Sequence, residues 1–276
     1  MNRRPPRDVS DLERRTYHQD GVICLRGMFD RDWIERMTAA IERSMQNPGR
    51  RGREATRPGE SGRFHMNVFM WRWDPDFRAF ALESPAGELA AQVLGQTQTR
   101  FFYDQIFAKE PETQAVTHWH QDLPYWPLRG EQIATIWLAL TPVSLKTSGV
   151  EYIAGSHRWG KFYRAITPDL DPHFTNMQLE VCPDFGAQRA TGEQRFIAFE
   201  MEPGDVTVHH PLIVHASGGN LSSTQRRLAL STRYLGEGVV WDERPATLVF
   251  PNQFRLPSGA PLIDESVFPI AWPRSH

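Results

Sequence analysis

The pattern of apolar and polar positions changes about one third of the way along the chain. Up to residue 98, apolar residues recur at helical spacing, which predicts α-helices joined by short segments. The segment VICL, residues 22–25, is the exception and is predicted to be a strand. A helix is predicted to begin near Asp30 and end before Pro48, with apolar positions at Ile34, Met37, Ile41 and Met45.

Two further helices are predicted from the residues at their ends. Ser10 and Glu13 have the spacing of a capping box, and Gly21 is suited to end the helix that they begin. Another helix carries an N-cap residue, a proline in the first helical position and a terminal glycine, at Ser84, Pro85 and Gly95.

From residue 99 onward, short segments rich in β-branched and aromatic residues predict strands separated by turns. Helices followed by many strands favour a mainly β fold, a sandwich or barrel with helices packed outside. The length of 276 residues favours one domain. Its predicted parts are a helical N-terminal decoration over 1–98, a β core over 99–236 with an insertion over 165–194, and an extended C-terminal arm over 237–276.

Two segments are predicted to be surface loops. Residues 47–63 are polar and rich in Gly, Pro and Arg, and residues 165–194 are rich in Pro and Asp. An unstructured connection is the simpler interpretation of residues 47–63. The functional alternative for both segments is a lid over a pocket.

Composition narrows the classes of function. The net charge of −2 offers no basic surface for a polyanion, so a nucleic-acid partner is not expected. Cys24 and Cys182 are too few for a disulfide framework, which favours a reducing, cytoplasmic location. The N-terminus lacks the apolar region of a secretory signal, and no apolar run is long enough to span a membrane. No pattern indicates an oligomeric state.

The stretch THWHQDLPYW, residues 117–126, carries the first candidate chemistry. His118, His120 and Asp122 occupy alternate positions, and alternate residues of a regular strand point to the same face. Two histidines and a carboxylate with open positions are typical of non-haem Fe(II) oxygenases. An HxD pair is a weak signal by itself, and a third ligand must come from elsewhere in the chain.

A second segment, residues 204–234, offers His209, His210 and His215. Two arginines follow, and because neighbouring strand residues face opposite sides, at most one of them points inward. Arg226 shares the parity of Leu228 and Leu230, which should face the core, so Arg226 is the predicted inward residue. A buried guanidinium needs an anionic partner, and a carboxylate of a small molecule would bind it in bidentate fashion.

Together these residues resemble the phytanoyl-CoA dioxygenase family of Fe(II)/2-oxoglutarate oxygenases. The resemblance covers about residues 99–236 and rests on WHQDLPYW, TIWLAL, SGVEYIAGSH and the spacing from His215 to Arg226. It implies a double-stranded β-helix (jelly-roll, cupin-like) core. It implies iron held by His120, Asp122 and His215, and the distal carboxylate of 2-oxoglutarate held by Arg226. It places further cosubstrate contacts at Ser217, Trp137 and Gln105.

Other residues near these motifs have weaker assignments. Tyr125 and Trp126 follow the HxD motif, and a substrate-facing role is weighed equally with core packing. His118 is interpreted as part of the pocket wall, because a fourth protein ligand would block a position that oxygen or 2-oxoglutarate needs. His157 is a minor candidate for a substrate contact. Lys109, at the end of its strand, is expected to be a solvated charge.

The resemblance implies an enzyme that uses Fe(II), 2-oxoglutarate and O2 to hydroxylate an unactivated C–H bond of a small organic molecule, releasing succinate and CO2. Halogenating relatives lack the carboxylate ligand, so Asp122 argues against halogenation. The alternatives are a desaturating or ring-modifying oxygenase of natural-product biosynthesis, and a cupin-type metal-dependent isomerase or hydrolase that does not use 2-oxoglutarate. A binding module without catalysis and a nucleic-acid demethylase are less favoured.

Overall fold

The computed structural model describes residues 1–274, and its larger elements are four helices and two antiparallel sheets. The helices lie in the N-terminal third, and their ends follow the capping signals of the sequence. They are α1 (Asp11–Asp20), α2 (Arg31–Gln46), α3 (Pro75–Glu83) and α4 (Ala86–Leu94). Seven short 3-10 turns in the described chain are η1 (Met70–Arg72), η2 (Leu123–Tyr125), η3 (Leu145–Thr147), η4 (Ser156–Arg158), η5 (Pro172–Asn176), η6 (Arg189–Thr191) and η7 (Pro251–Gln253).

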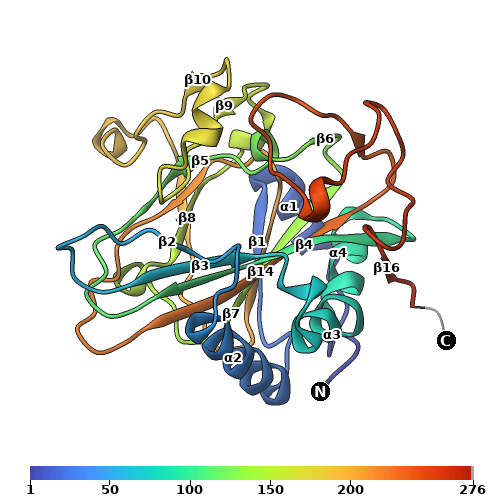
Figure 1. The fold of residues 1–276 in the computed structure, drawn as a ribbon, viewed down its shortest axis with the longest axis horizontal. Helices are drawn as coiled ribbons and strands as arrows, with labels where there is room; N and C mark the ends of the chain where they lie inside the picture. Colours follow the sequence, from blue (N-terminus) through green and yellow to red (C-terminus); the bar gives the residue numbers. More distant parts are fainter. Residues whose placement is uncertain (275–276) are drawn as a thin grey trace.

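The larger sheet has eight strands and crosses the middle of the molecule (Figure 1). Its strands pair in the order β1 (Val22–Leu25), β12 (Val206–His209), β7 (Ile133–Ala139), β14 (Arg227–Leu235), β4 (Thr99–Lys109), β3 (Phe64–Val68) and β2 (Arg53–Glu54), and β16 (Ile270–Trp272) also pairs with β4. Every pairing in this sheet is antiparallel.

The smaller sheet has four strands in the order β11 (Phe196–Ala198), β8 (Val150–Ile153), β13 (His215–Ser217) and β5 (Thr117–His120). Two small strand pairs lie outside both sheets: β15 (Val240–Trp241) with β6 (Leu128–Arg129), and β10 (Glu180–Val181) with β9 (Tyr163–Arg164). This arrangement of a larger and a smaller sheet confirms the predicted mainly β, jelly-roll fold with N-terminal helices.

The helices cover one face of the larger sheet, and the smaller sheet lies on the other side (Figure 1). Apolar residues of β14, β4 and β7 pack with the helices into the main core, which includes Leu228, Leu230, Trp33, Phe80 and Leu89. The opposite face of the larger sheet is not covered by helices and faces the smaller sheet. Polar side chains gather on this face, between the two sheets.

Most of the predicted local structure is present. The capping box of Ser10 and Glu13 forms, Gly21 ends α1 with a φ of 83°, and Asp30 caps α2. The first position of the fourth helix is one residue later than predicted, because Pro85 occupies the cap of α4. Several elements were not predicted, and two of them, α3 and β3, lie in the part of the chain that was assigned to helical decoration.

The predicted loops and arm also contain regular pairing. Within residues 47–63, β2 pairs with β3, and within residues 165–194, β10 pairs with β9. The C-terminal arm adds β16 to the larger sheet and buries aromatic residues such as Phe250 and Phe268 against Phe102 and Trp126. Among the described residues, no helix is long and apolar enough to cross a membrane.

Candidate functional site

His120, Asp122 and His215 converge between the two sheets. One candidate ligand atom from each lies within 4.8 Å of the others. His120 ends β5 and His215 begins β13, and these two residues are direct partners in the antiparallel pairing of the strands. Asp122 follows the end of β5 and immediately precedes the 3-10 turn η2. Strand pairing therefore brings together residues that are almost a hundred positions apart in the sequence.

Backbone carbonyl groups orient both imidazoles. His120 Nδ1 lies 2.7 Å from the carbonyl oxygen of His118, and His215 Nδ1 lies 3.0 Å from that of Ile213. A carbonyl only accepts hydrogen bonds, so Nδ1 of each ring carries the proton and Nε2 presents its lone pair. The two Nε2 atoms lie 3.7 Å and 3.8 Å from Oδ1 of Asp122.

These distances suit a single metal ion. Ligand atoms about 2.1 Å from a common ion lie about 3 Å apart at right angles and farther apart at wider angles. The observed separations need only a small contraction to reach that range. Two imidazole nitrogens with one carboxylate oxygen are the ligand set of non-haem iron centres, so the three residues fit Fe(II).

The carboxylate of Asp122 is held from several sides. Thr135 Oγ1 donates a hydrogen bond of 3.2 Å to Oδ2, and the same oxygen lies 3.5 Å from His209 Nε2 and 3.9 Å from Arg233 Nη2. Burial alone would raise the pKa of Asp122. The contacts with His120 and His209 and the charge of Arg233 outweigh it and hold the pKa well below its ordinary value. Asp122 is therefore an anion, as a metal ligand must be.

A cavity lies between the two sheets, and His118 is not among the described residues that line it, which contradicts the predicted place of His118 in the pocket wall. Between its pairings with β13 at His120 and at Thr117, β5 contains one extra residue. This bulge lets Thr117 and His120 both line the cavity, although they are three residues apart. Trp119 packs away from the cavity against Phe185, and His118 contributes its backbone carbonyl to the site.

The predicted inward orientation of Arg226 is also wrong. Arg226 lies just before β14, its side chain is 32% exposed, and it forms ion pairs with Glu42 of α2 and Glu110. From the alternation of residues along the strand, the apolar face of β14 was predicted to point into the β core. That face instead packs under the helices, through Leu228 and Leu230. The cavity lies on the opposite face, which the neighbouring arginine shares.

Arg227 points inward, as was predicted for Arg226. It is 1% exposed and lines the cavity. It donates hydrogen bonds to the carbonyl oxygen of Phe107 at 3.0 Å and to Ser148 Oγ at 3.3 Å, and its guanidinium lies 5.6 Å from the Trp137 ring centroid. Its Nε is buried without a partner. Burial lowers the pKa of Arg227 to about 9, which leaves it cationic at neutral pH.

Lys109 is buried beside Arg227, which contradicts the expectation of a solvated charge. The two residues are direct partners between β4 and β14, and Lys109 is 0% exposed. Lys109 Nζ donates to the carbonyl oxygen of Gly218 at 2.7 Å and to Ser217 Oγ at 3.3 Å. Burial, followed by the charge of Arg227, lowers the pKa of Lys109 well below its ordinary value. The chain thus places two basic groups together without a carboxylate within 4.0 Å among the described residues.

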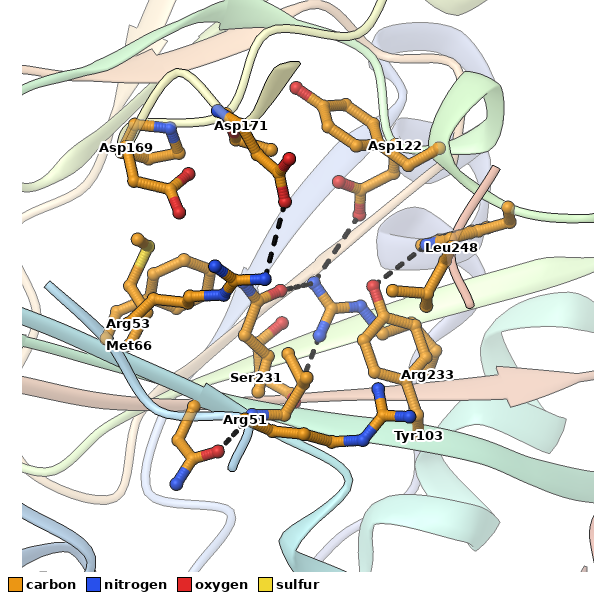
Figure 2. A pocket seen from close by; sticks show the side chains of 18 of the residues that line it. Arg51, Arg53, Met66, Tyr103, Asp122, Asp169, Asp171, Ser231, Arg233 and Leu248 are labelled. Atoms are coloured by element: carbon orange, nitrogen blue, oxygen red, sulfur yellow. Dashed lines mark hydrogen bonds and ion pairs between the residues drawn. The ribbon is translucent and has the colours of Figure 1, made fainter. Parts of the chain in front are cut away.

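A cavity of about 1270 Å³ contains the candidate metal site (Figure 2). Five other residues that were predicted to contact cosubstrate or substrate line it: Gln105, Trp137, Ser217, Tyr125 and Trp126. His157 does not take part, because its Nε2 lies 3.1 Å from the carbonyl oxygen of His18 and its ring packs against His210. The 47–53 segment and the 166–174 part of the insertion also line the cavity.

Two cavity residues were missed by the sequence reasoning. Arg233 and His209 are 3% and 2% exposed, and both lie beside Asp122. Arg233 has the strand parity of Arg227, so assigning the polar face of β14 to the cavity would have identified both arginines. His209 was named among the histidines of its segment without a role in the cavity; it faces the candidate ligands, with its ring centroid 4.8 Å from that of His215.

Comparisons with known proteins identify the family of the chain. The family model of phytanoyl-CoA dioxygenase (PhyH) matches residues 17–228. The chain is 24% identical over 230 residues to multifunctional dioxygenase prhA of Penicillium brasilianum, covering 78% of this chain and 68% of that protein. It is 27% identical over 237 residues to 1-deoxypentalenic acid 11-beta-hydroxylase of Streptomyces arenae, covering 79% and 78%.

Solved structures share the fold over almost the whole chain. The non-heme alpha ketoglutarate dependent carbocyclase SnoK from nogalamycin biosynthesis matches with a TM-score of 0.76 and 22% identity, covering 98% of this chain and 99% of that one. EctD from S. alaskensis with bound Fe matches with a TM-score of 0.69 and 16% identity, covering 94% and 88%. The family match includes the whole smaller sheet, most strands of the larger sheet and all three candidate metal ligands. The chain therefore belongs to the phytanoyl-CoA dioxygenase family of iron- and 2-oxoglutarate-dependent dioxygenases.

Proposed function

We propose that the protein holds Fe(II) through His120, Asp122 and His215 and hydroxylates an unactivated C–H bond of a small organic molecule. The observation that carries this proposal is the convergence of the three side chains, with both imidazole Nε2 atoms facing one carboxylate oxygen. When bound, the iron and 2-oxoglutarate with O2 supply the oxidising chemistry, and 2-oxoglutarate leaves as succinate and CO2.

We further propose that Arg227, in place of the predicted Arg226, binds the distal carboxylate of 2-oxoglutarate. Arg227 is buried in the cavity and has no carboxylate partner within 4.0 Å among the described residues, whereas Arg226 is satisfied by two glutamates outside it. A planar guanidinium binds a carboxylate through two parallel hydrogen bonds. Ser217 adds a hydroxyl on the same wall, and Lys109 Nζ donates a hydrogen bond to it.

The other residues of the site have supporting roles. His209, Thr135 and Arg233 orient the carboxylate of Asp122 so that it binds the metal through one oxygen. Trp137 forms part of the cosubstrate wall beside Arg227. Tyr125 is fixed by hydrogen bonds with the backbone of Ile166 and lies at the side of His120, where it limits access of water and places the substrate.

Hydroxylation is proposed as the reaction because it needs no residue beyond those that hold the metal and the two reactants. The hydroxylase of S. arenae has this activity in its name. A ring-modifying reaction is the second candidate. It is favoured by the match along nearly the whole chain to SnoK, which is a carbocyclase, and to the epimerase SnoN in complex with Fe3+, alpha ketoglutarate and nogalamycin RO.

Aerobic turnover tests the proposed function directly. The purified protein, supplied with Fe(II), ascorbate and 2-oxoglutarate, is expected to form succinate slowly even without its substrate. Asp122→Ala removes the anionic ligand, so succinate formation and Fe(II) affinity should both fall by at least about a thousand-fold. Arg57→Gln, on an exposed loop outside the cavity, is the matched control and should retain both.

Two outcomes would contradict the proposal. If the wild-type protein forms no succinate and binds no 2-oxoglutarate, it is not an oxygenase of this type. If it acts on a substrate without O2, and Arg227→Gln retains that activity, the metal serves as a Lewis acid, as in a cupin-type isomerase or hydrolase.

A further inference from the structure

The walls of the cavity carry far more positive than negative charge. Seven arginines line it, against three aspartates, of which Asp122 is a candidate metal ligand. Divalent iron and the 2-oxoglutarate dianion contribute equal and opposite charges, so loading the site leaves this excess unchanged. A cavity of low dielectric with unbalanced positive charge attracts anions and repels cations.

Arg233 carries this charge to the floor of the cavity, on the Asp122 side. It donates hydrogen bonds to Gln105 Oε1 at 3.0 Å and to the carbonyl oxygen of Ser231 at 3.3 Å, and its guanidinium lies 4.4 Å from the Tyr103 ring centroid. Its Nε is buried without a partner. The carboxylate nearest to it belongs to Asp122, and a bound metal ion would offset that negative charge. Arg233 is therefore a fixed, buried cation whose compensation is incomplete once the metal is bound.

Arg51 carries the charge at the rim. It donates to the carbonyl oxygen of Val249 at 3.0 Å and lies over the Phe69 ring, 5.0 Å from its centroid. In the described part of the chain, no carboxylate oxygen lies within 4.0 Å of its guanidinium. Arg53 provides the contrast, because Asp171 lies 3.5 Å from it. Figure 2 shows Arg51, Arg53 and Arg233 together in the same pocket.

We propose that the substrate is an organic anion. Arg51 attracts its anionic group into the cavity, and Arg233 holds that group near the cavity floor. This inference rests on the proposed function, since it names the substrate class of the same site. Arg227 is reserved for the cosubstrate, so the substrate anion uses a different part of the cavity wall. Arginine forks bind carboxylates and phosphate monoesters alike, so both are organic anions of the proposed class.

The test uses full-length protein loaded with Mn(II) and saturating 2-oxoglutarate in the absence of oxygen. Binding is measured by calorimetry for a panel of small carbon skeletons, each presented as the carboxylate, the phosphate monoester, the neutral primary amide and the amine. On the skeletons that bind, we expect an anionic member to bind at least about ten-fold more tightly than its amide, and the amines to bind least. The carboxylate and phosphate arms identify which anion is preferred.

Variants assign the preference to the named arginines. Arg51→Gln is expected to weaken binding of the anions by about five- to ten-fold and to leave the amides unchanged. Arg57→Gln, an exposed arginine on the same loop and outside the cavity, should change neither. Arg233→Gln should abolish the anion preference. Because Arg233 also lies 3.9 Å from Asp122, the Mn(II) resonance signal and the 2-oxoglutarate affinity of this variant are measured alongside. If Arg233→Gln disturbs the metal, the Arg51 variant decides the outcome.

Two results would overturn the inference. One is that amides or amines bind as tightly as the anions, or that no anion in the panel is preferred. The other is that Arg51→Gln and Arg57→Gln have the same effect. Failure of the proposed function is distinguishable, because the 2-oxoglutarate titration is performed first in the same preparation. A protein that binds 2-oxoglutarate but shows no anion preference contradicts only the substrate class.

Discussion

The two faces of strand β14 are both buried, but they differ in every other respect. Leu228 and Leu230 point to the helices, join the main apolar core and contribute burial. Arg227, Ser231 and Arg233 point to the cavity and carry charge and hydrogen-bonding groups into a buried space. The first face stabilises the fold, and the second positions reactants. In a jelly-roll that helices cover on one side, a strand face can be buried and still be polar.

A substitution on the helix-covered face should affect stability alone. Leu230 is almost fully buried in the main core, and Leu230→Ala removes apolar contacts and leaves a cavity. We expect the free energy of unfolding to fall by about 3–5 kcal/mol in urea denaturation. The 2-oxoglutarate affinity of the folded fraction should not change. Ser231→Ala, one residue further along, is the control and should cost less than about 1 kcal/mol. If Leu230→Ala instead weakened 2-oxoglutarate binding, the two faces would not be independent.

Asp104 gives the helix-covered side a dependence on pH. Its Oδ2 accepts a hydrogen bond from the backbone N–H of Trp71, and burial raises its pKa to about 7. The folded state therefore holds this proton more tightly than the unfolded state, so the contribution of Asp104 to stability is greatest in acid and falls as pH rises from about 4 through 7. Asp104→Asn should remove about 4 kcal/mol of that decline. Denaturation of both proteins at several pH values tests this, and parallel pH curves would contradict it.

Lys109 supplies the smallest expected effect, on the cavity side. Its lowered pKa means that the folded state releases its proton more readily than the unfolded state, so its burial costs stability below about pH 10 and less as the pH approaches that value. Lys109→Met should stabilise the protein without 2-oxoglutarate by about 1–2 kcal/mol at pH 7. It should also weaken 2-oxoglutarate binding several-fold. Lys146→Met, at an exposed position, should do neither. A destabilised Lys109→Met protein with unchanged affinity would refute this role.

The sequence was sufficient to predict the fold and to select the residues of the candidate metal site. The fold followed from a change in periodicity, and the HxD motif with a distant histidine pointed to ligands that strand pairing brings together. These signals are spacings between residues of one short segment, and such spacings can be read from the sequence without knowing the tertiary structure. The cap residues Ser10 and Gly21 and the start of α2 near Asp30 were predicted for the same reason.

The errors came from features that depend on tertiary structure. Alternation along a strand shows that Arg226 and Arg227 face opposite sides, but it does not show which side holds the cavity. The bulge in β5 breaks the alternation between Thr117 and His120. It is an irregularity between two strands, so a single strand sequence does not reveal it. Lys109 looked like a surface charge because its burial depends on Phe64, Ser217 and Gly218, which lie far away in the sequence.

The central claim is that the cavity face of β14 binds the cosubstrate through Arg227. The most direct test compares Arg227→Gln with Arg226→Gln by calorimetric titration of 2-oxoglutarate into the Mn(II)-loaded protein without oxygen. We expect Arg227→Gln to weaken binding by at least about a hundred-fold, because a buried charge-assisted pair is lost, and Arg226→Gln to change it less than about three-fold. A large loss in Arg226→Gln with near-normal binding in Arg227→Gln would contradict the account.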